Sequence, residues 1–336
     1  MTVRIGINGF GRIGRCVLKH CIARDDLEVV AVNDLTDVSD LAYLLKYDSV
    51  HGWYPREITC DEAQIKVGDH TIDFFSITDP SKIPWKEVGA DVVIESTGVF
   101  KTRAKAAKHL EGGARRVIIS APSDDPDIMI VLGVNDDKYD PKSHQVISLA
   151  SCTTNSLAPV AKVLNDTFGI ENLVFTTIHA YTSSQSLMDT PMSHRRRGRA
   201  AALSIIPTTT GAAGALEKVL PELTGKTKGI AMRVPVPDGS ITDIVATLNK
   251  DVTAEEVNNA LIQASQRPEL KNILRVSDEA LVSRDIIGDF HSAIIDSENT
   301  AVLNNRIVKL LSWYDNEWGY SSRLADFATI AARELL

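Results

Sequence analysis

The sequence predicts an α/β protein in which a doubly wound parallel sheet is followed by an α+β domain with a mixed or antiparallel sheet. Short apolar strands alternate with helices over the first ~150 residues, which is typical of a parallel sheet with crossover helices. The first strand also runs directly into a glycine-rich turn. From Asn172 onward the expected strands are longer and alternate between apolar and polar residues, as strands of antiparallel or mixed sheets do.

The first domain begins with a strand, a helix and a second strand. Val3–Asn8 and Leu27–Val32 are apolar, β-branched runs bounded by turn residues, and Arg15–Ala23 between them has apolar residues at helical spacing. This order is the βαβ unit from which parallel sheets are built. Further elements continue the alternation, with strands expected at 90–94, 117–120 and 146–148 and a helix at 103–111.

The second half of the chain has a different pattern of expected strands and helices. Its strands are expected at 173–179, 229–236, 240–248 and 302–313. Thr253–Ser265 reads as an amphipathic helix in which Thr253 is the N-cap and Glu256 completes a capping box. A polar, arginine-rich stretch at 182–199 is too irregular for a core element, and a final helix is expected over about 316–335.

Length and composition limit the class of protein. A length of 336 residues suggests two domains at ~150 residues each. The chain has 36 Lys and Arg against 44 Asp and Glu, a net charge of −8 that argues against a nucleic-acid binder. The apolar runs are far shorter than the ~20 residues of a membrane span, and no charged-then-apolar leader precedes Val3. The 4 cysteines have no metal-binding spacing, so we expect no metal site and a reducing cytoplasm.

The glycine turn has the spacing of a dinucleotide-binding motif. Gly9, Gly11 and Gly14 form G-x-G-x-x-G between a strand and a helix, and Asp34 ends the second strand. In the Rossmann unit the first glycine makes the turn, the second lets a pyrophosphate approach and the third lets the helix pack closely, while the helix N-terminus attracts the phosphates. Asp34 would bind a ribose 2′-hydroxyl and repel a 2′-phosphate, which predicts NAD rather than NADP.

Cys152 and His179 are the candidate nucleophile and base. Cys152 precedes an apolar helical run at 157–164, so it would lie near a helix N-terminus, where the dipole lowers the pKa of a thiol. His179 ends the strand at 173–179. From the residues alone, pairing the two is one possibility, and a structural role for each is the other.

A family resemblance rests on motifs that occur in order along the whole chain. They are Asn8-Gly-Phe-Gly-Arg-Ile-Gly-Arg15, Glu95-Ser-Thr-Gly98, Ser151-Cys-Thr-Thr-Asn155, His179-Ala-Tyr-Thr182, Ile206-Pro-Thr-Thr-Thr-Gly-Ala-Ala213, Arg233-Val-Pro235 and Trp313-Tyr-Asp-Asn-Glu-Trp-Gly319. Together they closely resemble the phosphorylating, NAD-dependent glyceraldehyde-3-phosphate dehydrogenases. The resemblance implies a homotetramer with an NAD-binding Rossmann domain at 1–151, a catalytic domain at 152–315, and a C-terminal helix at 316–336 that packs back on the first domain.

The resemblance also implies a reaction. Cys152 would attack D-glyceraldehyde 3-phosphate to give a thiohemiacetal, with His179 as base, and oxidation by NAD would give a thioester. Inorganic phosphate would then release 1,3-bisphosphoglycerate. Two phosphate sites are implied at Ser151, Thr153, Thr182, Arg197, Thr210, Gly211 and Arg233. Cofactor contacts are implied at Gly9, Gly11, Arg12, Ile13, Gly14, Asp34, Thr78, Thr97, Gly98, Ser120 and Asn316, of which Asn316 resembles the residue that orients the nicotinamide carboxamide.

Some positions depart from the family pattern, and alternatives stay open. Ser184 replaces an acidic residue of some relatives near the substrate phosphate, and Thr78 stands where arginine is common beside the adenine. The nearest alternative is erythrose-4-phosphate dehydrogenase, which has the same scaffold but usually lacks the Tyr181-Thr182 pair after the histidine. A second alternative is an inactive binding protein on this scaffold, against which the intact Cys152 and His179 argue.

Overall fold

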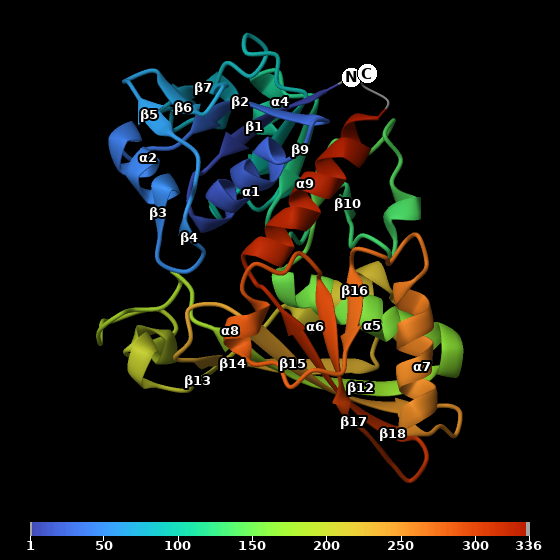
Figure 1. The fold of residues 1–336 in the computed structure, drawn as a ribbon. Helices are drawn as coiled ribbons and strands as arrows, with labels where there is room; N and C mark the ends of the chain where they lie inside the picture. Colours follow the sequence, from blue (N-terminus) through green and yellow to red (C-terminus); the bar gives the residue numbers. More distant parts are fainter. Residues whose placement is uncertain (1, 334–336) are drawn as a thin grey trace. The chain divides into compact units, whose positions relative to one another are not determined.

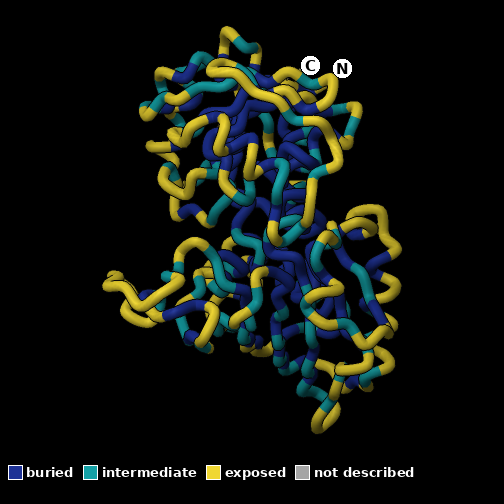
Figure 2. The backbone as a smooth tube through the Cα atoms, turned by 60° about the vertical axis from the view of Figure 1, so that its left-hand side comes forward, coloured by how far each residue is buried: buried dark blue, intermediate teal, exposed yellow. Residues whose placement is uncertain are grey.

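The computed structural model describes residues 2–333, and its internal contacts divide the chain into two compact units. The first unit contains the chain up to Ile130, then Lys138–Ala150, and the segment from Ser321 onward. The second unit contains Val131–Asp137 and Ser151–Tyr320. Figure 2 shows buried backbone at the centre of each unit and exposed backbone along its loops.

The sheet of the first unit is parallel through most of its width. Its strand order is β10-β11-β9-β8-β1-β2-β7-β6-β5, and neighbours from β10 to β7 are parallel while β7, β6 and β5 pair antiparallel. The strands are β1 (Val3–Asn8), β2 (Leu27–Asn33), β5 (Ile58–Cys60), β6 (Gln64–Val67), β7 (His70–Phe75), β8 (Val92–Glu95), β9 (Arg116–Ile119), β10 (Ile128–Met129) and β11 (Val146–Ser148). The parallel sheet is confirmed, and the antiparallel edge was not expected from the sequence.

Several connections of this unit contain short helices. They include α1 (Arg12–Ile22), α2 (Val38–Lys46), α3 (Arg103–Ala106) and α4 (Lys108–Glu111), with the small hairpin of β3 (Tyr47–Asp48) and β4 (Gly52–Trp53) after α2. The helix expected at 103–111 is present with the predicted outer bounds, but it is interrupted at Ala107 and forms two short helices. Ala107 N–H still bonds to the carbonyl of Arg103, but Leu110 N–H bonds three residues back to Ala107, which is the tighter 3₁₀ spacing that ends an α-helix.

The second unit contains the expected mixed sheet, with helices on one face. The strand order is β13-β14-β12-β15-β18-β17-β16, in which β12 pairs parallel with β14 and β16 with β17, and the other neighbours are antiparallel. Helix α5 contacts both α6 and α7, and each of the three contacts strands of this sheet (Figure 1). The elements are α5 (Cys152–Phe168), β12 (Ile170–Ala180), β13 (Ile206–Thr208), α6 (Ala212–Val219), β14 (Thr227–Val234), β15 (Ser240–Leu248), α7 (Ala254–Ser265), β16 (Leu274–Ser277), α8 (Ser283–Ile286), β17 (Ala293–Leu303) and β18 (Ile307–Tyr314). The last helix, α9 (Trp318–Ala332), begins in the second unit, and its residues from Ser321 belong to the first unit.

The strand expected at 302–313 is confirmed only in part, as β18 from Ile307, because residues 302–303 end β17 and the turn of a hairpin lies between the two strands. Strands β17 and β18 are antiparallel, and the turn between them contains Asn304 and Asn305 with φ of 49° and 58°. Asparagine tolerates this left-handed backbone better than most residues, so the pair suits a tight turn. The capping box of Thr253 and Glu256 at the start of α7 is confirmed.

Two expectations for the rest of the chain also hold. The stretch at 182–199 has only a short 3₁₀ turn, Arg195–Gly198, and is mostly exposed. Helix α9 starts two residues later than expected, at Trp318, and residues 334–336 lie outside the described part of the chain. Within residues 2–333 no helix is both long and apolar enough to cross a bilayer.

Candidate active site

The glycine turn between β1 and α1 has the geometry that its spacing predicts. Gly9 has φ of +93°, and a Cβ there would lie 2.6 Å from the Thr97 nitrogen. A Cβ on Gly14 would lie 2.2 Å from the Gly9 carbonyl oxygen, so the helix can approach the turn only with glycine at this position. At Gly11 the side-chain position is open, with no described heavy atom within 4 Å. The turn is therefore tight on its inner side and free where a pyrophosphate would approach.

A pocket of about 470 Å³ opens beside this turn, entirely within the first unit. Five of the expected cofactor residues line it, namely Gly9, Gly11, Asp34, Thr78 and Thr97. The sequence analysis did not assign the other lining residues as cofactor contacts; they are Asn8, Asn33, Leu35, Ile77, Ser96, Val99 and Phe100. Arg12, Ile13 and Gly14 belong to the first turn of α1, while Gly98 and Ser120 lie outside this lining.

The Asp34 carboxylate already supports the pocket. Its Oδ2 accepts the main-chain N–H of Phe10 at 2.7 Å, and its Oδ1 accepts that of Thr36 at 2.9 Å. Each carboxylate oxygen has two lone pairs, so the group can still accept a sugar hydroxyl. Arg12, by contrast, is engaged with Asp48, since its Nη1 lies 2.8 Å from Asp48 Oδ1.

The second unit brings Cys152 and His179 together. Ser151 is the N-cap of α5 and its hydroxyl accepts the Thr154 N–H, which makes Cys152 the first residue of the helix. Cys152 Sγ lies 3.4 Å from His179 Nε2, on β12. His179 Nδ1 lies 2.7 Å from the Ala180 carbonyl oxygen, which can only accept, and 3.1 Å from Arg233 Nη1, which can only donate. Because Arg233 Nη1 also donates to that carbonyl at 2.9 Å, the shorter contact of Nδ1 places the ring proton on Nδ1. Nε2 therefore presents a lone pair to the thiol.

Burial controls the protonation of this pair. It raises the pKa of the Cys152 thiol, although the Arg233 charge and hydrogen bonds from Thr153 act to lower it. Burial also lowers the pKa of His179, and the Arg233 charge lowers it further. The expectation that the helix N-terminus leaves Cys152 with a lowered pKa is not met, because loss of hydration outweighs the favourable terms. The resting pair is a thiol beside a neutral base.

Arg233 lies beside this pair, in register with His179 across β12 and β14. Its Nη1 donates to the Ala180 carbonyl at 2.9 Å and to Thr182 Oγ1 at 3.2 Å. The Thr182 hydroxyl also lies 2.8 Å from Ser184 Oγ, so serine at 184 adds a neutral hydroxyl where some relatives carry a negative charge. A guanidinium with two hydroxyls next to the thiol suits a phosphate group.

A second set of anion-binding groups surrounds the start of α6. Arg197 Nε donates to Thr208 Oγ1 at 2.9 Å, and its Nη2 lies 3.4 Å from the Thr209 carbonyl oxygen. Thr210 Oγ1 accepts the Ala212 N–H, and Gly211 is the N-cap of α6 with open space at its side-chain position. The expected phosphate residues thus include two distinct groups, one at Arg233 and one at Arg197.

The structure adds two residues that the sequence analysis did not assign to the site. The buried Tyr314 hydroxyl bonds to Thr153 Oγ1 at 2.9 Å and Thr177 Oγ1 at 2.8 Å, and its ring meets the His179 ring edge-on at 6.0 Å. Thr153 therefore turns its hydroxyl to Tyr314. Tyr314 lies within the motif at 313–319, which was the only signal for it in the sequence.

Ser240 is the second addition, and it links the base to Asn316. Its Oγ accepts the Ala180 N–H at 3.0 Å and donates to Asn316 Oδ1 at 2.5 Å. The Asn316 amide thereby keeps its N–H₂ group for another partner. Ser240 is fully buried and begins a predicted strand, so nothing in the sequence distinguished it from a structural serine.

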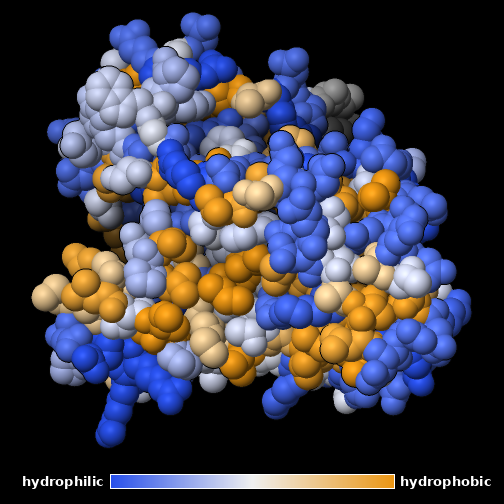
Figure 3. Space-filling view, turned by 60° about the horizontal axis from the view of Figure 1, so that its bottom comes forward, coloured by the Kyte–Doolittle hydropathy of each residue, from blue (hydrophilic) through white to orange (hydrophobic). Residues whose placement is uncertain are grey.

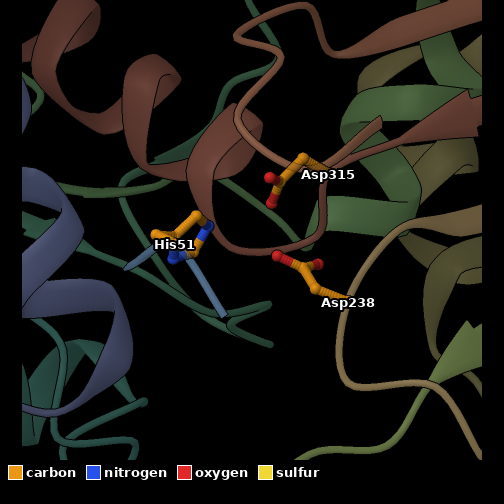
Figure 4. Close-up of side chains that lie close together, drawn as sticks. All are labelled: His51, Asp238 and Asp315. Atoms are coloured by element: carbon orange, nitrogen blue, oxygen red, sulfur yellow. The ribbon is translucent and has the colours of Figure 1, made fainter. Parts of the chain in front are cut away.

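Two carboxylates fix the loop that carries Asn316. Figure 4 shows Asp238 and Asp315 with their carboxylates turned toward each other. Asp238 Oδ1 accepts the Asn316 N–H at 3.2 Å. Asp315 Oδ1 accepts the N–H groups of Glu317 and Trp318, and its Oδ2 accepts that of Gly288. These contacts set the main chain on both sides of Asn316 and cap the start of α9.

Comparison with known proteins gives matches over nearly the whole chain. Residues 3–103 match the NAD binding domain of glyceraldehyde 3-phosphate dehydrogenase, and residues 151–316 match its C-terminal domain. The chain is 56% identical to the glyceraldehyde-3-phosphate dehydrogenase of Geobacillus stearothermophilus over 332 residues, 99% of each chain. It is 54% identical to glyceraldehyde-3-phosphate dehydrogenase 1 of Bacillus subtilis over 334 residues, 99% of each chain, and 53% identical to the Streptomyces coelicolor enzyme over the full length of both.

Proposed function

Because the chain belongs to the glyceraldehyde-3-phosphate dehydrogenase family, we propose that it oxidises and phosphorylates D-glyceraldehyde 3-phosphate to 1,3-bisphosphoglycerate, the NAD-dependent step of glycolysis. The observation that carries the proposal is the contact of 3.4 Å between Cys152 Sγ and His179 Nε2, with Arg233 beside it. A nucleophile, its base and a phosphate-binding cation thus meet in one place.

The residues of the second unit account for the proton transfers. His179 Nε2 takes the thiol proton as Sγ bonds to the aldehyde carbon, and returns it to the oxygen to give the thiohemiacetal. The same nitrogen then takes the hydroxyl proton as the carbon is oxidised to the thioester. NAD, when bound, supplies the acceptor for the hydride. Inorganic phosphate attacks the thioester carbon, the acyl phosphate leaves, and the sulfur recovers a proton from His179.

The main chain around Ala180 keeps His179 in the reactive tautomer. The Ala180 carbonyl accepts Nδ1–H, and the Ala180 N–H is held by Ser240. Since Nδ1 is engaged, Nε2 is the nitrogen that exchanges a proton with sulfur and substrate. The low pKa of the buried imidazole keeps it unprotonated between turnovers.

The first unit fits NAD, and we assign the cofactor to it. The open position at Gly11 and the N-terminus of α1 beside it suit the pyrophosphate. The Asp34 carboxylate suits an unphosphorylated ribose and disfavours NADP. We assign the remaining contacts to the expected cofactor residues, with Asn316 as the donor to the nicotinamide carboxamide. We also propose an NAD-binding domain at 1–151, a catalytic domain at 152–315 and a C-terminal helix at 316–336.

The two anion-binding groups account for two phosphates. We assign Arg233 and Thr182 to one phosphate and Ser151, Thr153, Thr210 and Gly211 to the other, with Arg197 near both. A dehydrogenase that used water as the acyl acceptor would need only one such group. This difference in number supports a phosphorylating enzyme, and it makes the acceptor the property to test.

The protein would act as a homotetramer. Val174 on β12 and Ile230 on β14 are 51% and 46% exposed, and both lie on the sheet, with Leu203 and Ile205 exposed near its β13 edge. Figure 3 shows apolar side chains gathered in patches on the surface. Exposed apolar surface of this kind is covered in an oligomer by a second copy. The reaction needs a free thiol at Cys152, so we place it in the reducing cytoplasm.

Rapid mixing without phosphate tests the proposal. We expect a burst of NADH of about one per active site that then stalls at the thioester, and arsenate or phosphate should restart it. Sustained NADH formation without either anion would show that water is the acceptor and would reject the proposal. A higher kcat/KM for erythrose 4-phosphate than for glyceraldehyde 3-phosphate would instead favour the erythrose-4-phosphate dehydrogenase alternative.

A further inference from the structure

A buried hydrogen-bond network lies in the first unit and takes no part in the reaction described above. It contains Glu95 at the end of β8 and His109 on α4, which are 2% and 0% exposed, together with the fully buried Trp85. Asn8 at the end of β1 joins it from the pocket side. Buried polar groups of this kind are expensive to hold unless every partner is present, so their arrangement specifies a geometry.

The tautomer of His109 is set by Trp85. The indole Nε1–H can only donate, and it lies 3.0 Å from His109 Nδ1. Nδ1 is therefore the acceptor and Nε2 carries the proton. Nε2 in turn lies 3.1 Å from Glu95 Oε2, to which it donates.

The Glu95 carboxylate receives donors from both of its sides. Oε2 accepts from His109 Nε2 and, at 2.6 Å, from Asn8 Nδ2. Oε1 accepts the Thr97 N–H at 2.9 Å and the Thr97 hydroxyl. All four groups are donors, so a side chain with an N–H₂ group in place of one oxygen would set donor against donor.

The network continues from Asn8 to the other wall of the pocket. Asn8 Oδ1 accepts from Asn33 Nδ2 at 2.8 Å. Asn33 Oδ1 accepts the Ile77 N–H at 2.9 Å, and its Nδ2 donates to the Ile77 carbonyl at 3.0 Å. Glu95 accordingly connects three segments that line the pocket, namely Thr97, the chain at Asn8 and Gly9, and the chain at Ile77 and Thr78.

We propose that Glu95 is a positioning residue that presets the dinucleotide pocket, with His109 and Trp85 fixing its donors. The proposal rests on the proposed function in taking NAD as the ligand. A site whose walls are held in place before binding loses less entropy when the ligand arrives, so affinity depends on Glu95, His109 and Trp85 even though none of these three lines the pocket. Losing it should weaken NAD binding without changing the chemistry at Cys152.

Glu95→Gln tests this with NAD affinity measured by calorimetry, which does not depend on turnover. The N–H₂ group of the glutamine must face either the two donors of Thr97 or the donors of Asn8 and His109, so at least one pair of donors loses its acceptor. We expect Kd for NAD to rise about ten- to a hundredfold, the range for one or two buried donors left unpaired. The KM for NAD should rise similarly, whereas kcat at saturating NAD and the KM for glyceraldehyde 3-phosphate should stay within about twofold.

Two further variants separate positioning from packing. Val93→Ala removes buried apolar contact on the same strand, near Trp85, and should lower Tm with Kd unchanged. Trp85→Phe removes the indole donor together with part of a fully buried ring, so it should lower Tm as Val93→Ala does. Unlike Val93→Ala, it should also raise Kd for NAD and add the Nδ1–H form of His109 to the ¹⁵N spectrum. This variant carries the test should Glu95→Gln not fold.

Different results would overturn the role of Glu95 and the assignment of NAD as the cofactor. A folded Glu95→Gln protein that binds NAD as the wild type does would overturn the proposal, as would an equal rise in Kd for Val93→Ala. Failure of the wild-type protein to bind NAD in the same titration would reject the proposed cofactor itself. Because that result is read from the wild type alone, it is distinguishable from a failure of Glu95.

Discussion

Replacing Arg233 with leucine should change two properties of the site, namely the protonation of Cys152 and His179 and the binding of phosphate. The guanidinium lies beside the catalytic pair and beside the hydroxyl that we assign to phosphate, since Nη1 donates to the Ala180 carbonyl and to Thr182 Oγ1. Its charge lowers the pKa of Cys152 and that of His179. Removing it must therefore raise both values, so thiolate forms at higher pH and the imidazole gains its proton at higher pH.

The size of the phosphate effect follows from one contact. A hydrogen bond between charged partners is worth about 1.5–3 kcal/mol, and 1.36 kcal/mol corresponds to a factor of ten. Losing the contact from Arg233 should lower kcat/KM for glyceraldehyde 3-phosphate by roughly ten- to a hundredfold. Arg197→Leu is the matched control, because Arg197 bonds to Thr208 and Thr209, and its charge lowers the pKa of His179 less than the Arg233 charge does.

Two measurements check this prediction. The rate of iodoacetamide alkylation of Cys152, followed against pH, should move to higher pH in Arg233→Leu and stay nearly unchanged in Arg197→Leu. Steady-state kinetics should show the loss in kcat/KM in both variants. An alkylation profile that is unshifted in Arg233→Leu, with kcat/KM within threefold of wild type, would refute the electrostatic reasoning.

The remaining predictions concern four side chains. Alkylation of Cys152 in a Cys60→Ser background, which removes the exposed thiol, should abolish turnover in proportion to labelling measured by mass spectrometry; activity that survives full labelling would contradict this. His179→Gln should lower kcat by about 10²–10⁴-fold with Kd for NAD nearly unchanged, and a failure mainly in NAD affinity would remove His179 from the chemistry. Asp34→Ala should lower the ratio of kcat/KM with NAD to kcat/KM with NADP about tenfold. Its Tm is the control, because the Phe10 N–H loses its acceptor. A wild-type enzyme that uses NAD and NADP equally well would refute the assignment. Ser240→Ala should lower kcat about tenfold by freeing the Asn316 amide and leaving the Ala180 N–H unpaired, and a kcat within twofold would contradict the link.

Local patterns in the sequence were sufficient for most of the fold. Apolar runs and their spacing predicted β1, β2, β15 and the capped helix α7, because strand and helix periods report which face is buried. The glycine spacing predicted the turn, since Gly9 and Gly14 have geometries that a Cβ would obstruct. The α/β class and the family resemblance, carried by long ordered motifs, are confirmed by the family matches.

What the sequence left open depends on contacts between distant residues. Apolar residues on both sides of Asn304 and Asn305 look like one strand until the left-handed turn is seen. The pairing of Cys152 with His179, and the contribution of Ser240, depend on the register between strands and on one helix end. The pKa of Cys152 depends on burial, which no residue type reveals. The network around Glu95 was invisible for the same reason: a carboxylate, an imidazole and an indole far apart in the chain acquire donor and acceptor roles only when folding removes water and leaves them no other partners.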